Sequence, residues 1–563
     1  MRKTIIVGSL MALPVIMMGQ SALDAYQLGQ SGLRGTARFM SMGGAFGALG
    51  GDLSTLNQNP AGIGVYRSSE IGATLDINMQ STKSKAQGYS MSRDQTKVAC
   101  NNFGYVGAIS LGSTSAMPFF NWGASYSRVA SFDRAYRGQF NDLGYSLSNY
   151  VADYTTAANR WTPNQNGPIS NNIGVNTGLG GDNAYNPFQD SYAPWMSILM
   201  YNAYTINPTS SSPDNTSYQG LFKNGTTGVG TFDVLEKGYV DEYSINFGGN
   251  VMNTVYWGVG FGITDISYTS STYYTEDLNN ANIPSVKAVT EDGGFITDGT
   301  ETGNGGFGLD SYKHIYGTGF NFKAGVIVKP INELRLGLAV HTPTWYNMSY
   351  EGWAQVDYGY SSHPDFSGAF ESDGGYYDAF DWKYRSPWRL IASAAGVIGG
   401  KGIISVDYEY RANQSMSVKD NDGNVYEDIQ GDIKNYYQSS NILRLGGEYR
   451  LNPNWSVRAG YSYESSPVKK EASDGQVQIL TEGPDNTGTQ PSYAFDNNTQ
   501  YITCGVGFHY QNFYVDAAYV HRHRSSTFHA YDSFLVDGTR VDAPSAKITD
   551  SNNSLVFSLG FRF

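Results

Sequence analysis

Apolar and polar side chains alternate with a period of two along most of the chain. At the C-terminus, one face of the alternating segment carries Leu555, Phe557, Leu559, Phe561 and Phe563. The other face of that segment carries serine, valine, glycine and arginine. A second face that is polar or glycine recurs in four further segments, residues 71–80, 255–264, 334–341 and 443–451. A period of two indicates β-strands whose two faces meet different surroundings.

The alternation predicts fourteen strands, at residues 69–80, 102–112, 119–129, 239–249, 255–268, 316–328, 333–344, 384–398, 401–413, 439–451, 454–465, 498–509, 512–524 and 553–563. Each strand has about the ten residues that a tilted strand needs to cross a bilayer. Single-chain bacterial barrels have an even number of antiparallel strands, with an apolar outer face and a polar lumen. The predicted fold is therefore all-β, a 14-stranded antiparallel transmembrane β-barrel over residues 67–563.

The predicted connections alternate between short and long. The long ones are residues 81–101, 130–238, 269–315, 345–383, 414–438, 466–497 and 525–552. Outer-membrane barrels have short periplasmic turns and long extracellular loops, which matches this asymmetry. A soluble β-sandwich, the alternative fold, gives no reason for it. Within the first very long loop, residues 147–158 have the apolar spacing of an amphipathic helix.

Composition supports the membrane assignment and excludes one class of partner. Aromatic residues make up 14% of the chain, and aromatic side chains stand at predicted strand ends, where the interfacial girdles of a barrel would lie: Tyr66, Trp122, Trp257, Trp345, Trp388, Trp455 and Tyr510. The net charge of -13 argues against a nucleic-acid partner, which calls for a basic surface.

Residues 1–20 read as a secretory signal peptide. Arg2 and Lys3 precede an uncharged, mostly apolar run to Met18, and small and polar residues follow. The alternative is a membrane anchor, but the run is shorter than the roughly 20 residues that a spanning helix needs. We therefore expect export to the outer membrane of a Gram-negative cell.

Residues 21–66 do not alternate. They contain a Gly-rich apolar stretch (residues 38–48, RFMSMGGAFGA) and then a stretch that ends in Asn59-Pro60-Ala61-Gly62. A bare periplasmic tail would expose this apolar surface to water. We therefore expect residues 21–66 to fold into the lumen of the barrel.

Residues 37–62 resemble the corresponding part of the FadL/OmpP1/TodX family of hydrophobic-compound transporters. Further stretches resemble the same family: residues 126–133 (YSRVASFD), 334–343 (LRLGLAVHTP), 443–449 (LRLGGEY) and 458–461 (RAGY). The C-terminal Phe563 fits the signal that the barrel-assembly machinery reads in such proteins.

The resemblance implies fourteen strands, an N-terminal hatch over residues 21–66 that plugs the lumen, and substrates that leave sideways into the membrane through an inward kink in the third strand. By resemblance, Asn59, Pro60 and Ala61 lie near that kink, and Phe46 lies in the apolar part of the hatch. Our candidate for the kink is Asn121-Trp122-Gly123, because glycine inside a strand marks bulges and close approach.

Charged residues recur on the lumen face of neighbouring predicted strands: Asp407, Glu409, Arg444, Glu448, Arg458 and Glu464. They could orient a carboxylate substrate. The interpretation that we favour is mutual pairing that fixes the wall or anchors the hatch, since charges away from bulk water need partners.

Other candidates for chemistry are weak. His521 and His523 share a strand face but lack a third metal ligand, and residues 420–424 (DNDGN) lack the spacing of a calcium loop and read as a turn. Cys100 and Cys504 are expected to be free thiols. The histidines lie in no recognisable catalytic motif and the chain has no G-x-S-x-G elbow, so we expect no enzyme, cofactor or metal.

The sequence thus predicts passive, hatch-gated uptake of a hydrophobic small molecule, such as a long-chain fatty acid, with outer-membrane lipid at the exit. An alternative is a surface-binding or adhesion barrel whose long loops, 130–238 and 269–315 above all, bind a partner. A third possibility is a channel for polar solutes.

Overall fold

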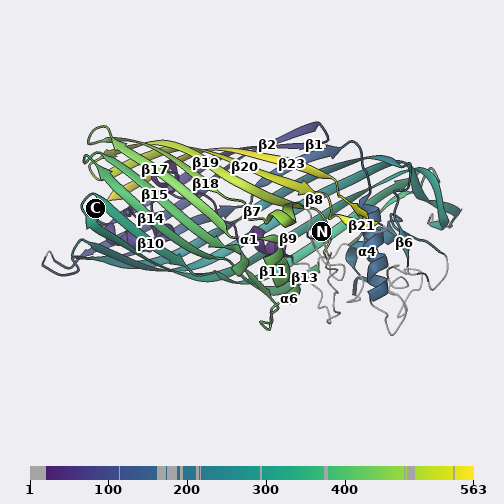
Figure 1. Cartoon of the computed structure of the whole chain (residues 1–563), viewed down its shortest axis with the longest axis horizontal. Coiled ribbons are helices and arrows are strands. Elements are labelled where there is room, and N and C mark those ends of the chain that lie inside the picture. Colours follow the sequence, from purple (N-terminus) through teal and green to yellow (C-terminus); the bar gives the residue numbers. More distant parts are fainter. Residues whose placement is uncertain are drawn as a thin grey trace, which may run out of the picture.

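Fourteen antiparallel strands form the barrel in the computed structural model of the chain (Figure 1). The structure describes residues 21–112, 114–161, 173, 187–189, 194–210, 215, 217–291, 294–372, 378–474, 477, 488–536 and 539–563, so the predicted signal peptide lies outside the described residues. Neighbouring wall strands pair in sequence order, and β1 closes the ring against β23 from Glu70–Arg562 onward. Closure removes the sheet edges that lipid could not satisfy.

The wall strands, in chain order, are β1 (Glu70–Ala86), β2 (Tyr89–Ser110), β3 (Phe119–Ser131) followed by β4 (Arg134–Phe140), β7 (Thr227–Val251), β8 (Val255–Val289), β9 (Phe295–Ile331), β10 (Leu334–His341) followed by β11 (Trp345–Tyr360), β13 (Asp378–Arg385) followed by β14 (Trp388–Ile398), β15 (Gly402–Ala412) followed by β16 (Ser417–Lys419), β17 (Ser440–Arg450), β18 (Trp455–Glu464), β19 (Tyr493–Tyr510), β20 (Phe513–His529) and β23 (Ser545–Arg562). Each predicted strand overlaps one of these.

Several strands run far beyond the predicted ends. Residues 81–101, predicted as a long loop, instead continue β1 and β2 to a turn at Gln87-Gly88. Most of residues 269–315, also predicted as a loop, continue β8 and β9 in the same way. Above the bilayer no lipid requires one face to be apolar, so the alternation that reveals a membrane strand fades there although the hydrogen-bonded ladder continues.

The apolar rows of the wall point outward, as predicted. Leu338, Leu559 and Ile502 are 60%, 59% and 60% exposed, although each is a large apolar side chain. Polar side chains of the opposite face, such as Asp407 and Asn246, are fully buried. A soluble sandwich would show the reverse, with the apolar rows between two sheets. In the part of the chain that the structure describes, no helix is long and apolar enough to cross a membrane.

Most of the predicted girdle aromatics are also outward and exposed. Trp345, Trp388, Trp455 and Tyr510 are all among the exposed side chains. Trp257 is half-buried. Tyr66 is buried, with Leu53, Leu56, Ile63 and Val106 around it. Its place before the first strand identified it wrongly as an interfacial residue.

Residues 21–66, named the hatch from here on, lie inside the barrel. They form α1 (Ala22–Leu28), α2 (Ala37–Ser41), α3 (Thr55–Gln58) and the 3₁₀ helix η1 (Pro60–Val65). Two wall glycines allow the hatch to approach closely. A Cβ added to Gly258 would lie 2.1 Å from the carbonyl oxygen of Pro60, and one added to Gly325 would lie 1.9 Å from Asn59 Oδ1. Glycines on the inner face thus serve hatch packing.

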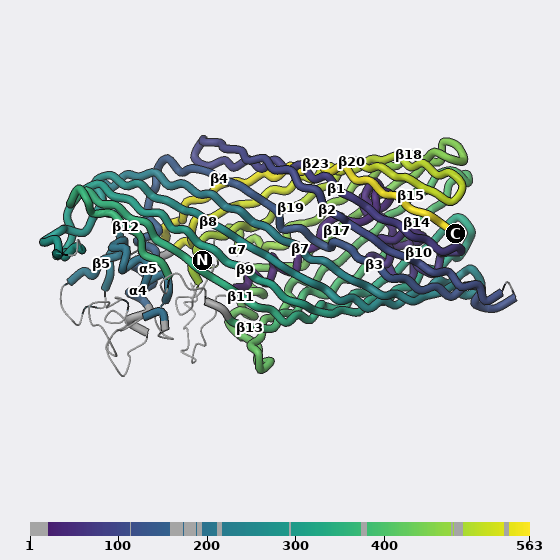
Figure 2. Tube along the Cα trace, turned by 180° about the vertical axis from the view of Figure 1, so that it is seen from behind, coloured from purple at the N-terminus to yellow at the C-terminus, as the bar shows by residue number. Residues whose placement is uncertain are grey.

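The extracellular loops fold into a cap with its own hydrophobic core. The cap contains α4 (Leu147–Trp161), η3 (Pro187–Gln189), α5 (Trp195–Asn202), β5 (Asn207–Pro208), β6 (Tyr218–Gln219) and β12 (Ser367–Glu371), beside the outer parts of β7, β8, β9 and β11 (Figure 2). The predicted helix within residues 147–158 is confirmed. Its first turn is anchored by Glu276, which accepts the Leu147 N–H at 2.8 Å.

Smaller elements complete the outer end. They are η5 (Asn413–Ser415), α6 (Glu427–Tyr436), α7 (Lys470–Ser473), β21 (Phe534–Val536) and β22 (Thr539–Val541). Helix α6 lies over the outer end of the hatch, where the rings of Tyr26 and Tyr437 stack at 4.7 Å between centroids.

Candidate functional site

The third wall strand leaves its neighbour partway across the barrel. Strand β3 pairs with β2 from Ser110–Phe119 only as far as Asn102–Ser127. Beyond this point β2 continues to Tyr89 paired with β1 alone, while the continuation β4 pairs with β7. Among the described residues, the outer part of β2 therefore has no ladder partner on the β3 side. This interruption of the wall is called the β2–β3 gap.

Past the gap, β4 turns into the lumen. Arg134 of β4 donates to Ser526 Oγ at 2.7 Å, although Ser526 belongs to β20, which lies beyond β2, β1 and β23 around the barrel. The ring of Tyr136 likewise meets that of Phe528 edge-on at 5.8 Å. Only a strand that crosses the interior can make these contacts. Lys97 of β2 pairs with Asp133 beneath the β1–β2 hairpin.

The hatch occupies the inner side of the gap. The backbone N–H of Gly32 donates to the carbonyl of Val129 at 3.0 Å, as a neighbouring strand would. Arg34 Nη1 donates to Asn101 Oδ1 at 2.9 Å and forms an ion pair with Asp76 at 3.2 Å. Hatch residues 32–34 thus replace the missing ladder partner with a few polar contacts to β1, β2 and β3.

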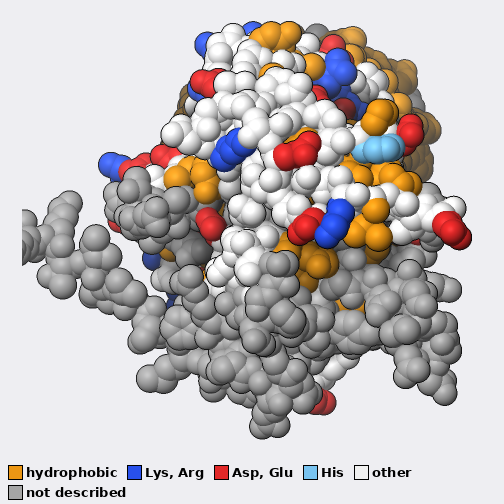
Figure 3. All heavy atoms as spheres, turned by 90° about the vertical axis from the view of Figure 1, so that its right-hand side faces the viewer, with side chains coloured by type: hydrophobic (Ala, Val, Ile, Leu, Met, Phe, Trp, Pro, Cys, Tyr) orange, Lys and Arg blue, Asp and Glu red, His pale blue; other side chains and the backbone are white. Residues whose placement is uncertain are grey.

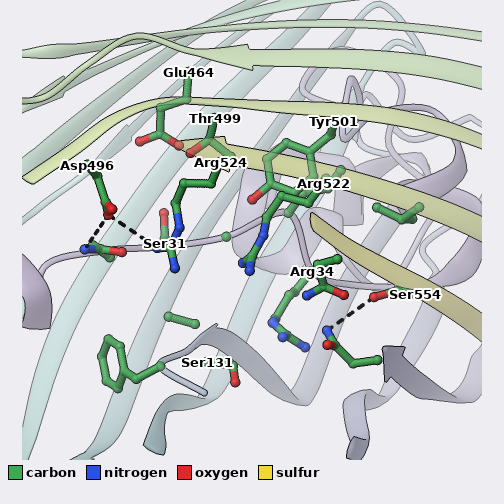
Figure 4. Close-up of a pocket in the computed structure, with 18 of the residues that line it drawn as sticks. Ser31, Arg34, Ser131, Glu464, Asp496, Thr499, Tyr501, Arg522, Arg524 and Ser554 are labelled. Atoms are coloured by element: carbon green, nitrogen blue, oxygen red, sulfur yellow. Dashed lines mark hydrogen bonds and ion pairs between the residues drawn. The ribbon is translucent and has the colours of Figure 1, made fainter. Parts of the chain in front are cut away.

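Two cavities flank hatch residues 30–34. One, of about 70 Å³, is shown in Figure 4 and reaches β3, β19, β20 and β23. The other, of about 110 Å³, reaches the facing wall. Pockets that enclose drug-sized ligands measure roughly 300–1,000 Å³. These two cavities are therefore too small for any such molecule, and its passage beside hatch residues 30–34 requires the hatch or β3 to move.

The cavity walls are rich in cations. The first cavity is lined by Arg34, Arg411, Arg522 and Arg524, and the second by Arg34, Arg128, Lys323, Arg389 and Arg444. In Figure 4 the guanidinium groups of Arg522 and Arg524, both on β20, and of hatch residue Arg34 reach into the space. Apolar side chains, Leu33 in both cavities and Phe132 in the first, share the lining. Each of these cations is ion-paired with a carboxylate, for example Arg34 with Asp76, so the space offers paired charges next to apolar surface.

The predicted pairing of interior charges is confirmed. Fully buried Glu409 accepts from Arg389 at 2.7 Å and Arg444 at 2.7 Å, and lies 3.4 Å from Arg411. Glu448 binds hatch residue Arg38 at 2.9 Å. Asp407 accepts the backbone N–H groups of Phe46 and Gly47 at 3.0 and 2.8 Å. These charges fix the wall and anchor the hatch.

The predicted hatch residues are all buried, on the side of the hatch away from the cavities. Asn59 donates to the carbonyl of Gly47 at 2.6 Å and accepts the N–H of Ala61 at 3.1 Å, so it braces two hatch turns. Pro60 begins η1. Phe46 is fully buried and contacts Phe39, with ring centroids 5.6 Å apart. None of Phe46, Asn59, Pro60 or Ala61 lines either cavity.

The third strand is regular at Asn121-Trp122-Gly123. These residues pair without interruption with Ala108, Gly107 and Val106 on one side, and with β7 on the other. Trp122 faces outward, and a Cβ on Gly123 would meet hatch residue Ile63 at 3.2 Å. The ladder to β7 is irregular only between Arg128 and Ala130. The candidate kink is therefore corrected: the strand departs at residues 127–133, where sequence pattern alone gives no signal.

Asp432 lies on α6, the helix that contacts α1 of the hatch. Burial raises the pKa of this carboxyl to about 7, and nearby Asp428 adds to the increase. An unfolded aspartate has a pKa of about 3.9. Between these values the folded state holds a proton that the unfolded chain releases, so the packing of α6 loses stability as the pH rises from about 4 to 7.

We accordingly expect amide hydrogens of residues 427–436 to be better protected at pH 5 than at pH 8, after correction for intrinsic exchange. In Asp432→Asn, which carries no titrating group there, this difference should disappear. Hydrogen exchange with mass spectrometry measures both proteins. An unchanged pH dependence in the variant would show that another group is responsible.

The remaining candidates are two histidines, two cysteines and a short acidic segment. His521 and His523 lie on the outer wall, and no group of three or more potential metal ligands occurs among the described residues. Both cysteines are free. Residues 420–424 form the predicted turn, in which Asn424 N–H donates to Asp420 Oδ1 at 2.8 Å.

The outward apolar rows, the closed antiparallel ring and the plugged lumen together define an outer-membrane β-barrel. The fold is that of a FadL homologue of Pseudomonas aeruginosa: the solved structure covers 95% of this chain and 100% of its own, with a TM-score of 0.50 at 13% sequence identity. The toluene transporters TodX of Pseudomonas putida (12% identity, 94% of this chain, 99% of that one, TM-score 0.43) and TbuX of Ralstonia pickettii (14%, 94%, 99%, 0.40) also match.

No family model and no curated protein sequence matches the chain. The identities are low, so the comparison establishes the fold and not the compound that passes.

Proposed function

We propose that this protein takes up small hydrophobic compounds through the outer membrane by passive diffusion, and that the compounds leave the lumen sideways through the β2–β3 gap. The observation that supports the proposal is the interrupted ladder above Asn102 and Ser127, closed on its inner side by hatch residues 32–34. A molecule in the cavity of Figure 4 would stand beside this interruption.

The gap suits an apolar cargo. Val98 of β2 lies four residues beyond Asn102, the last residue of β2 that pairs with β3. Its side chain is 69% exposed on the outer face of the wall. An apolar molecule that passes outward there would enter hydrocarbon without crossing the polar headgroups. Its transfer from water into the bilayer supplies the free energy, at roughly 25 cal/mol per Å² of apolar surface removed from water.

The cavity lining combines charged and apolar side chains, which suits an amphiphile with a polar head, such as a long-chain fatty acid. Arg34, Arg522 and Arg524 would donate to a carboxylate in exchange for part of their present pairing with wall carboxylates. Leu33 and Phe132 would contact the chain. The toluene transporters named above act on neutral rings according to their descriptions, so the head group is where this protein would differ from them.

The test is a substitution that fills the exit. Ser131 lines the cavity at the gap, and Ser131→Trp adds a large rigid ring there. We expect uptake of a labelled fatty acid into cells or proteoliposomes to fall at least about tenfold, because the cavity has little spare volume. Ala124→Trp is the matched control, since Ala124 lies on the lipid-facing side of the same strand.

Both variants should migrate as folded, heat-modifiable barrels. Normal uptake by a folded Ser131→Trp protein would refute the lateral route. Equal loss of uptake in both variants would show that a tryptophan anywhere in β3 impairs uptake, and that filling the cavity is not the cause.

The adhesion alternative stays a prediction. On the described surface of the extracellular end, apolar side chains and charges of both signs are interspersed (Figure 3).

A further inference from the structure

Three lysines stand together on the outer wall, just above the apolar band. Lys83 and Lys85 lie on β1, and Lys547 lies on the neighbouring β23. All three are exposed, and they share the outward face of the sheet with Ile71, Leu75 and Met79 lower on β1. The strands β2, β1 and β23 run side by side along the upper edge of the barrel in Figures 1 and 2.

The register brings two of these charges directly opposite each other. Lys85 pairs with Lys547 across β1 and β23, and Lys83 is two residues below Lys85 on the same face. Side chains directly opposite on neighbouring antiparallel strands have Cβ atoms about 5 Å apart, and like charges so placed destabilise the pair. Among the described residues, none of the three lysines has an ion-pair partner.

The nearby outward positions do little to neutralise the group. The outer face of β23 beside the lysines carries Thr549 and Ser551, and that of β20 carries His521 and His523 lower down. The one carboxylate on the outer face of β2 at this height is Asp94, which lies opposite Ser81 and not opposite a lysine. The protein thus leaves a local excess of positive charge beside hydroxyl groups.

The height of the lysines fits the headgroup layer. Lys83 is four residues beyond Met79, the last large exposed apolar residue on the strand. At about 3.3 Å per residue and a tilt of about 40°, it lies roughly 10 Å above the edge of the hydrocarbon. That is where the phosphate groups of an outer-leaflet lipid are found, and a lysine stem of four carbons can bend toward them.

We infer that Lys83, Lys85 and Lys547 form a docking site for the phosphate groups of an anionic glycolipid in the outer leaflet. Charge complementarity carries the assignment: a like-charged cross-strand pair becomes favourable once a phosphate bridges the two ammonium groups, and the adjacent hydroxyls can donate to the same oxygens. The site is independent of the transport route, because these side chains point away from the lumen.

The experiment compares lipid retention by native mass spectrometry in a mild neutral detergent. The probes are bis-phosphorylated lipid A, the same lipid without phosphates, and inorganic phosphate. The test variant is K83Q/K85Q/K547Q. The matched control is K401Q/K434Q/K470Q, which removes three exposed lysines from a periplasmic turn and from two loop helices.

We expect wild type and control to retain phosphorylated lipid A in preference to the dephosphorylated form. The test variant should bind the phosphorylated form on the order of a hundredfold more weakly, at about 1 kcal/mol for each of the three lysines near a charged surface. The barrel should stay folded, because removal of mutually repelling charges costs no packing.

Equal retention by the test variant and wild type would overturn the inference. So would release of bound lipid A by inorganic phosphate at equimolar concentration, since the site would then be a free-phosphate site. Loss of binding in both triple variants would also overturn it, because the effect would reflect net charge alone.

Discussion

Deletion of residues 24–60 should convert the closed barrel into an open pore. The hatch occupies the lumen and contacts separate strands of the wall, through Arg38 with Glu448 on β17 and through Asn57 with Lys323 on β9 at 2.9 Å. The wall does not need the hatch to close its ring, since β1–β23 pairing runs from Glu70 outward. The lumen face exposed by the deletion is polar and water can hydrate it.

In planar bilayers, full-length protein should show almost no steady conductance, and the deletion variant should show steady openings at least about tenfold larger, as expected of a wide unplugged barrel. Heat-modifiable migration on a gel serves as the folding control. A folded variant with the conductance of the full-length protein would mean that something other than the hatch seals the lumen.

The second large effect concerns Glu409. Three guanidinium groups, those of Arg389, Arg411 and Arg444, converge on this one buried carboxylate. Glu409→Gln keeps the shape of the side chain but leaves this cluster without its shared counter-charge. Removal of one partner of a buried ion pair costs about 3–5 kcal/mol, because the remaining charge stays desolvated.

We expect the free energy of unfolding in liposomes, measured by denaturant titration, to fall by an amount in that range. Glu301→Gln is the matched control, because Glu301 is an exposed residue of the extracellular hairpin whose side chain accepts only from Ser285. If the unfolding midpoint of Glu409→Gln equals that of wild type, water in the lumen screens these charges and the ion pairs contribute little to stability.

The membrane strands were predictable because lipid forces a strict alternation. Leu443 and Leu445 face the lipid and are apolar, and Arg444 between them faces the lumen. The structure shows both leucines exposed and Arg444 buried. The outer hairpins could not be predicted, because they extend beyond the lipid that forces this alternation. Residues such as Lys83 and Ser92 pair across β1 and β2 above the bilayer, where neither face needs to be apolar.

The interior charges were recognisable, but their partners were not. The period of two places Glu448 and Arg458 in the lumen, whereas the contact of Glu448 with hatch residue Arg38 depends on how a segment hundreds of residues away folds. Pairing was still the better prediction, because a desolvated charge without a partner is too costly.

The β2–β3 gap escaped sequence analysis altogether. Glycine inside a strand predicts a kink, and this placed the kink at Gly123 of the third strand. Gly123 instead lies against the hatch, and the strand departs at Val129 and Ala130, which are ordinary strand residues. A missing ladder partner is a property of two strands and the segment between them, and no single residue type marks it.

The most direct test of the account locates the cargo on the protein. A fatty acid with a photoreactive diazirine on its chain would be irradiated with the protein in liposomes, and the labelled peptides mapped by mass spectrometry. The account predicts label in residues 28–34 of the hatch and 127–133 of the third strand, removed by excess unlabelled fatty acid. Label confined to lipid-facing side chains such as Leu338 and Leu559, with none in those two segments, would contradict it.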